Sequence, residues 1–286
     1  MSRIFFIDTA IPADRKKWGK HKMHTVFDGN KVFKVGRLTE LDAKEIYIDS
    51  LLPQIYEELM ELIEKGVRVF LLRNTRLLKR LREENRVKKS DEVDAKLLSM
   101  IPRNHFKQLT LRELNLLRLI GEYERYVKWR KTVQQWMRIC PDPFKECVRR
   151  LRSLAEHHGR KIIREIKNDE SYATIYRLAC NMIGVKDSVE VAILVARLPL
   201  NWKLRRLKGL LGLAPYKDNN YYNHKLREYL SRLAANLYLN SKRFNKTELL
   251  KEVINNNKGL RTLEIKILRV LKKAWQQRRY TLAGGQ

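Results

Sequence analysis

The chain has 286 residues, of which 44% are hydrophobic, and it carries 61 Lys and Arg against 32 Asp and Glu, a formal net charge of +29. The hydrophobic fraction is sufficient for buried cores, which excludes wholesale disorder, and the length allows two modest domains or one domain with extensions. The basic residues are spread along the chain, which favours a nucleic acid bound across a broad surface. A membrane is the competing polyanion, but the longest apolar stretch, residues 189–195, contains Glu190 and is far too short for a span.

The cysteines and the N-terminal residues indicate the cellular compartment of the protein. Cys140, Cys147 and Cys180 form no CxxC pair, and their odd number is typical of a reduced interior. The first residues form an apolar run that ends in Asp8, without the charged start and cleavage site of a signal peptide. We therefore expect a cytoplasmic protein, associated with the nucleoid if it binds DNA.

Residues 1–104 have the pattern of a ribonuclease-H-like α/β domain, a central sheet flanked by helices. The predicted order is a strand, a hairpin, a strand, a helix and a further strand, at residues 4–7, 23–35, 45–49, 51–65 and 67–72. The turn of the hairpin is Asp28–Lys31, and the helix ends at Gly66. Two more helices follow, and the second carries Asp91 and Asp94.

Residues 105–168 have the pattern of a long helical hairpin. Apolar residues from Leu119 to Met137 recur with coiled-coil spacing, Pro141 and Pro143 interrupt the pattern, and helical spacing resumes to about Lys167. The exposed face of the second helix is basic, which fits contact with nucleic acid or another subunit, although simple solvation is an equal alternative. That face contains Arg149, Arg150, Arg152, Arg160, Lys161 and Arg164.

Residues 169–286 are predicted to form an all-helical domain, with amphipathic helices at 226–239 and 260–275. A turn around Gly184 and Lys186 separates two apolar helical stretches. Such a turn can bring backbone N–H groups close to a phosphate, but many helix corners need a glycine for geometry alone.

The segment Lys88–Leu98 carries the clearest chemical signal. Asp91 and Asp94 are three residues apart and share a helix face, where like charges require a compensating cation. Asp8 ends the first apolar run and Asp49 ends the fourth strand. If the fold brings these four acids together, they would suit two hard cations, Mg²⁺ or Mn²⁺. The alternative is a solvated helix face with ordinary charges.

The order of these acids, Asp8, Asp49 and then the Lys-Ser-Asp-x-x-Asp-Ala of residues 89–95, resembles the DEDD transposases. These are the Piv/MooV DNA invertases and the insertion-sequence family one-hundred-and-ten, which have a RuvC-like domain. The middle of the chain is similar to that family's coiled-coil segment. Residues 209–215 stand where the family has Gly-Leu-Ala-Pro, and residues 223–230 resemble its Leu-Arg helix.

Two positions depart from the family pattern. The family usually has Glu where this chain has Asp49, and it carries a nucleophilic Ser-Gly before the Leu-Arg helix. The corresponding interval, residues 216–222, contains no serine, so the covalent step of strand exchange is in doubt. Tyr221 or Tyr222 could attack a phosphate, although aromatic residues in such loops more often stack or pack.

The resemblance implies a metal-dependent protein that processes DNA strands, with Asp8, Asp49, Asp91 and Asp94 as ligands, a guide or structural RNA, and a homo-oligomeric assembly. Two alternatives stay open: a structure-selective endonuclease on branched DNA, and a non-catalytic DNA- or RNA-binding relative. The residues expected to contact nucleic acid are Lys88, Lys89, Arg149, Arg150, Arg160, Lys161, Gly184, Lys186, Lys225 and Arg227.

Overall fold

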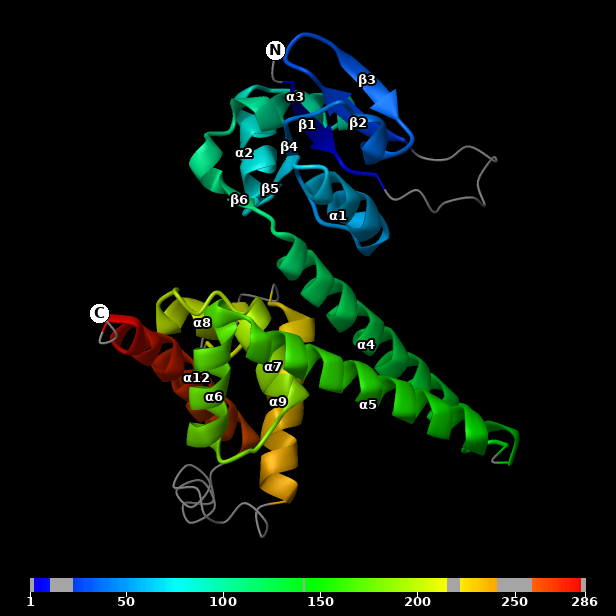
Figure 1. The fold of residues 1–286 in the computed structure, drawn as a ribbon, viewed down its shortest axis with the longest axis vertical. Helices are drawn as coiled ribbons and strands as arrows, with labels where there is room; N and C mark the ends of the chain where they lie inside the picture. The colour runs from blue at the N-terminus through cyan, green and yellow to red at the C-terminus, as the bar shows by residue number, and fades with distance from the viewer. Residues whose placement is uncertain (1–2, 11–22, 141, 215–221, 241–258, 284–286) are drawn as a thin grey trace. The chain divides into compact units, whose positions relative to one another are not determined.

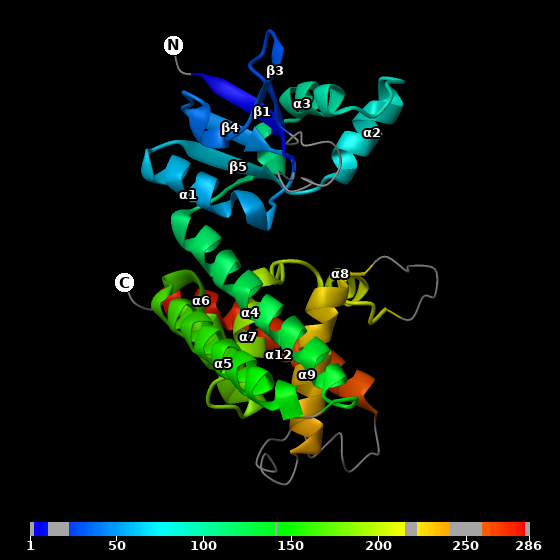
Figure 2. The same cartoon turned by 90° about the vertical axis from the view of Figure 1, so that its right-hand side faces the viewer.

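The computed structural model describes residues 3–10, 23–140, 142–214, 222–240 and 259–283. The chain divides into two compact units, Met1–Gly121 and Glu122–Gln286 (Figures 1 and 2). We predicted boundaries after residues 104 and 168, whereas the single division falls after Gly121. The long helix α4 (Leu111–Trp136) begins in the first unit and continues into the second.

The first unit contains a six-stranded mixed sheet with the order β3-β2-β1-β4-β5-β6. Strands β1, β4 and β5 are parallel to one another, whereas β2, β3 and β6 pair antiparallel with their neighbours. The strands are β1 (Ile4–Asp8), β2 (His24–Phe27), β3 (Val32–Val35), β4 (Glu45–Ile48), β5 (Arg68–Leu72) and β6 (Phe106–Gln108).

The predicted hairpin is confirmed. Strands β2 and β3 pair antiparallel, and Asp28 Oδ1 accepts hydrogen bonds from the amides of Asn30 and Lys31. Gly29 has a φ of +97°, a value that favours glycine at this position. Strand β6 was missed because its three residues are too few to show a period of two.

Helices cover both faces of the sheet (Figure 1). Strand side chains alternate between the faces, so Ile46 and Ile48 pack with α1 (Tyr56–Glu64), and Tyr47 packs with α2 (Arg76–Glu84) and α3 (Asp91–Met100). These elements confirm an α/β N-terminal unit with helices on either side of the sheet.

Tyr47 organises the face of the sheet that α3 covers. Its ring stacks on Phe6 and Phe70, with centroids 5.2 and 4.8 Å away, and meets the edge of Phe106 at 5.0 Å. Its hydroxyl donates to Glu45, which also forms an ion pair with Arg68. Burial, together with the bond to Glu45, raises the pKa of Tyr47 to about 12. The aromatic layer therefore fixes β1, β4 and β5 beneath α3.

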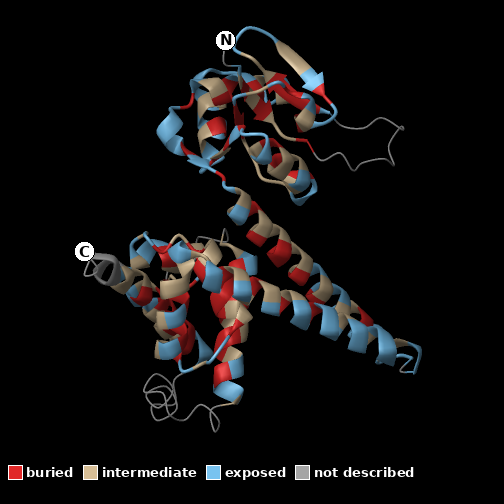
Figure 3. Cartoon of the chain, in the orientation of Figure 1, coloured by how far each residue is buried: buried red, intermediate tan, exposed pale blue. Residues whose placement is uncertain are grey.

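The second unit is helical. The helices after α4 are α5 (Lys145–Asn168), α6 (Glu170–Ile183), α7 (Val189–Arg197), α8 (Leu204–Leu210), α9 (His224–Leu239) and α12 (Leu260–Ala283). The first half of α5 is largely exposed, as Figure 3 shows, whereas α6, α7, α9 and α12 all contribute buried residues. In the described part of the chain, no helix combines the length and apolar character needed to cross a membrane.

The two long helices of the predicted hairpin are present as α4 and α5. From Glu122 onward α4 faces α5: the ring of Tyr126 lies 4.9 Å from that of His158, and Glu122 pairs with His158 Nε2 at 3.0 Å. Coiled-coil packing of these helices stays a prediction. Helix α12 extends past the predicted end at Trp275 to Ala283.

We predict that Ile48→Ala lowers the free energy of unfolding of the first unit by roughly 2–5 kcal/mol, because the side chain is completely buried and its removal leaves a cavity. Met100→Ala is the control, since Met100 is 57% exposed and its substitution should cost less than about 0.5 kcal/mol. Urea unfolding followed by circular dichroism measures both. Equal losses in the two variants would contradict the assigned core.

Candidate metal centre and nucleic-acid surface

Asp8 and Asp49 lie at the same edge of the sheet. Asp8 is the last residue of β1, and Asp49 directly follows β4, its parallel neighbour. The strands pair Ile7 with Ile48, and the Asp49 amide extends the ladder by donating to the Ile7 carbonyl at 3.3 Å. Carboxyl ends of adjacent parallel strands are where α/β sheets place polar functional groups.

Helix α3, which carries Asp91 and Asp94, packs against β1 and β2. Ser90 caps the helix, and its Oγ accepts a hydrogen bond from the Val93 amide at 3.2 Å. Asp91 and Asp94 occupy the first turn, where the helix dipole favours negative charge. Asp94 is buried, whereas Glu92 is exposed, as expected for the side of the helix away from the sheet.

Arg82 supplies the compensating cation for Asp94. Its Nη1 lies 2.5 Å from Asp94 Oδ1, and the two side chains are only 17% and 7% exposed. No sequence pattern predicted this pair, because Arg82 lies on α2 among other basic residues and reaches Asp94 only through the packing of α2 against α3. A cation bound by Asp94 would have to compete with this guanidinium.

Asp49 is also held by the protein. Its Oδ1 accepts hydrogen bonds from both the amide and the hydroxyl of Thr9, each at 2.9 Å. The Thr9 hydroxyl also contacts Ser50. Both bonds to Asp49 use the same oxygen, so this carboxylate is oriented by Thr9 while its Oδ2 makes neither contact.

Two buried polar atoms beside the end of β1 have no hydrogen-bond partner within the described ranges. They are Thr25 Oγ1, on the residue that pairs with Asp8, and His24 Nε2. His24 Nδ1 accepts from the Ala10 amide at 3.1 Å, and burial lowers the His24 pKa, although Asp49 and Glu40 oppose this shift. Sequence reasoning missed both residues, because their proximity to Asp8 and Asp49 arises from sheet pairing.

The described residues contain no group of three or more His, Cys, Asp or Glu placed to hold a metal ion. Asp49 is hydrogen-bonded to Thr9 and Asp94 is paired with Arg82. The chemistry of the donors nevertheless fits a hard cation: Asp8 and Asp49 supply carboxylates at neighbouring strand ends, and the buried Thr25 hydroxyl beside Asp8 has no hydrogen-bond partner among the described residues. Rotation of Asp94 away from Arg82 is the change that binding would require.

The loop between α2 and α3 presents the predicted Lys88 and Lys89 as exposed side chains. Arg86, in the same loop, has a φ of +53°, the left-handed conformation in which a side chain costs roughly 1 kcal/mol relative to glycine. Its amide donates to the Glu83 carbonyl and that of Val87 donates to the Arg82 carbonyl, so the end of α2 accounts for this conformation.

Four of the predicted basic residues have acidic partners within the protein. Arg149 and Arg150 both pair with Glu146, and Lys225 pairs with Glu124 at 3.2 Å. Arg227 donates to the Leu211 carbonyl and pairs with the buried Glu264 at 2.6 Å. The structure thus gives Arg227 an internal role.

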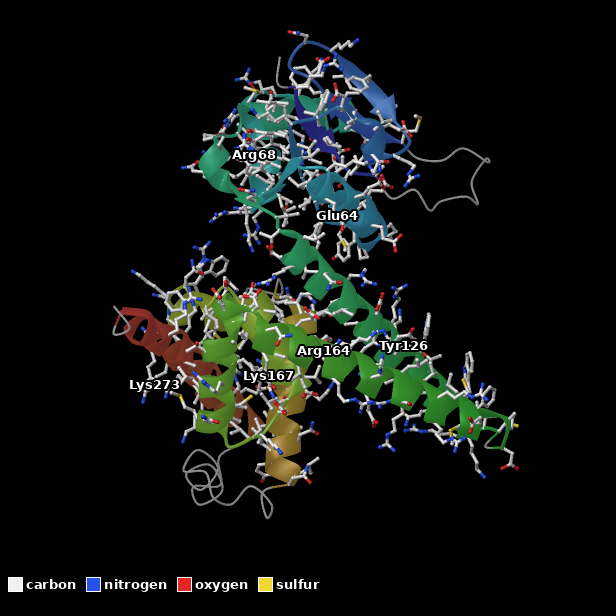
Figure 4. All side chains as sticks on the ribbon, in the orientation of Figure 1. Glu64, Arg68, Tyr126, Arg164, Lys167 and Lys273 are labelled. Atoms are coloured by element: carbon white, nitrogen blue, oxygen red, sulfur yellow. The ribbon has the colours of Figure 1, made fainter. Side chains whose placement is uncertain are left out.

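Arg160, Lys161 and Lys186 have no acidic partner within ion-pair distance in the described part of the chain. On α5, Arg164 continues this unpaired basic face, whereas Lys167 pairs with Asp187 at 2.8 Å (Figure 4). These residues form the part of the predicted surface whose charge is not compensated locally.

Gly184 ends α6 with a φ of +84°. Its amide and that of Val185 both donate to the Cys180 carbonyl, the arrangement of a glycine C-cap. The helix end therefore accounts for this glycine without a phosphate, and neither amide points to one.

Of the two candidate tyrosine nucleophiles, the structure describes only Tyr222. Tyr221 lies outside the described residues. The ring of Tyr222 packs so closely on Gly212 that a Cβ there would lie 2.9 Å from it, and it also lies 4.0 Å from the His224 ring. This packing agrees with a structural role for Tyr222.

Comparison of the chain with protein-family models gave no match, and a search of curated proteins also found none.

We predict that Arg82→Leu lowers the free energy of unfolding by roughly 3 kcal/mol, because it leaves Asp94 buried without its cation. Arg80→Leu on the same helix is the matched control: its pair with Glu84 is exposed and should contribute less than about 1 kcal/mol. Chemical unfolding measures both, and equal stability of Arg82→Leu and the parent would contradict the importance of the buried pair.

Proposed function

We propose that this chain is a nucleic-acid-binding protein of the transposase and recombinase type, whose first unit processes DNA strands with divalent metal. The observation that carries the proposal is the position of Asp8 and Asp49 at adjacent parallel strand ends, with Asp94 on the helix that packs against β1. The sheet order and the helices on both faces support a RuvC-like, ribonuclease-H-like domain.

The proposed cofactor is Mg²⁺ or Mn²⁺ in a two-ion site held by Asp8, Asp49, Asp91 and Asp94. When bound, such ions activate a water or a 3′ oxygen and stabilise the leaving oxygen. Thr9 fixes the orientation of Asp49, and Ser90 fixes the first turn of α3, so these residues position the carboxylates. Arg82 neutralises Asp94 until a cation takes its place.

The proposed partners are DNA and a guide or structural RNA. The net charge of +29 supports a polyanionic partner, and the uncompensated Lys88, Lys89, Arg160, Lys161 and Lys186 are the residues best suited to contact phosphates. Arg149, Arg150 and Lys225 could contribute only by exchanging an internal ion pair for a phosphate.

We also propose that the chain forms a homo-oligomer through residues 129–154 of the α4–α5 hairpin. Large apolar side chains are exposed there, more than an isolated surface helix needs. They are Trp129, Trp136, Ile139 and Leu154, which are 50%, 50%, 87% and 40% exposed. A second copy of the chain would cover them.

A structure-selective endonuclease on branched DNA is the second candidate, favoured by the missing serine in residues 216–222. The same acidic site would then hydrolyse strands at a junction, without a covalent protein–DNA intermediate. A binding protein that retains the fold without catalysis is the third.

We predict that the protein with Mg²⁺ nicks labelled DNA, and that Asp8→Asn slows nicking by at least about a hundredfold, because a ligand to the metal is lost. Asp42→Asn is the control: Asp42 lies in the same unit, but its pair with Arg3 at 3.6 Å is on the surface. Denaturing gels with four-way junctions and linear duplex measure the rates.

The substrate distinguishes the candidates. Selective nicking of the junction favours the endonuclease, and a covalent protein–DNA adduct on the gel favours recombinase chemistry. If Asp8→Asn nicks DNA as fast as the parent, the acidic site is refuted. If the parent binds every substrate and nicks none, the third candidate, a non-catalytic binding protein, is favoured.

A further inference from the structure

A cavity of about 430 Å³ lies within the second unit, between α4, α5, α7 and α9. Its size is in the range of small-molecule sites, which typically measure roughly 300–1,000 Å³. Apolar side chains from all four helices line part of it: Val127, Ile163, Val189 and Leu233. Arginines from the two long helices, Arg130 and Arg160, line it as well.

The two arginines have unused donors. No protein hydrogen bond or ion pair joins either guanidinium to a described residue, and Arg130 Nε is shielded from solvent without a partner. A buried donor without a partner destabilises a protein, so a ligand that accepts a hydrogen bond from Arg130 would relieve this cost. Either guanidinium can also turn toward a ligand without breaking an internal bond.

The acids around the cavity are already neutralised or hydrogen-bonded. Glu156 pairs with Arg152 at 3.6 Å, and Asp187 pairs with Lys167 at 2.8 Å and accepts a hydrogen bond from Tyr176. The Ser188 hydroxyl donates to Glu190 at 2.9 Å. Glu190 thus keeps its negative charge, but the two arginines outnumber it, so the uncompensated charge at this cavity is positive on balance and favours an anionic ligand.

The N-terminal end of α7 adds to this preference. Ser188, which caps the nine-residue helix, lines the cavity, and the first turn of a helix carries partial positive charge, part of which Glu190 in that turn offsets. The combination of an apolar wall with two free guanidinium groups and a helix start matches a ligand that has a flat apolar part and a phosphate.

We propose that this cavity binds one unstacked nucleotide of the nucleic-acid strand, with the phosphate against Arg130 and Arg160 and the base against the apolar wall. The inference rests on the proposed function, because a bound strand is the source of the nucleotide. It adds a second contact, in the helical unit, to the acidic site of the first unit. A free nucleotide has the same chemistry, so it serves as the probe.

The test compares Arg130→Met with Arg125→Met, which removes the same charge from an exposed site on the same helix, outside the cavity. Thymidine monophosphate is titrated in EDTA, with thermal unfolding and calorimetry as readouts. Arg130→Met should bind about tenfold more weakly, the loss expected for one charge-assisted hydrogen bond, whereas Arg125→Met should match the parent. Without nucleotide, Arg130→Met should unfold at the same or a higher temperature than the parent.

Competition experiments identify the class of ligand. A 12-mer single strand should compete with thymidine monophosphate in the parent and not in Arg130→Met, and inorganic phosphate should bind much more weakly than the nucleotide. Equal binding of phosphate and nucleotide, or unchanged binding by Arg130→Met, would overturn the proposal. Asp8→Asn should bind the nucleotide as tightly as the parent. The experiment therefore distinguishes failure of the cavity proposal from failure of the proposed metal site.

Discussion

The parallel pairing of β1 with β4 is the constraint on which the account of this protein depends. It places Asp8 and Asp49 at neighbouring strand ends, although they are far apart in the sequence. The aromatic layer of Phe6, Tyr47 and Phe70 holds the same strands beneath α3. Asp94 lies on that helix, which packs against β1 and β2.

Charge compensation determines what each site can bind. In the first unit, Arg82 neutralises Asp94 and Thr9 donates to Asp49, so the proposed cation would have to compete with these protein groups. In the second unit the acids at the cavity have partners, whereas Arg130 and Arg160 have none among the described residues. The proposed function needs both kinds of site, because it requires a metal ion at the carboxylates and a phosphate at the arginines.

The regular elements could be predicted from the sequence because their signals are local. The Asp28–Lys31 turn indicated the hairpin, and coiled-coil spacing from Leu119 indicated the long helix, now seen as α4. Strand β6 was too short to be recognised, and the break at Gly121 was missed because α4 continues through it.

The candidate site was predictable only in part. The positions of the four acids followed from motif order, but their partners depend on packing between distant segments. Arg82 looks like any basic residue of α2, and Arg227 looks like a surface cation until its contact with Glu264 is seen. The cavity had no sequence signal at all, since its lining comes from four helices.

The most direct test of the central claim is anomalous diffraction from crystals of the protein grown with Mn²⁺. We predict a manganese peak at the carboxyl ends of β1 and β4 beneath α3, within coordination distance of Asp8 and Asp49, and a rotation of Asp94 away from Arg82. A saturated crystal with no peak there and the Arg82–Asp94 pair intact would contradict the metal site.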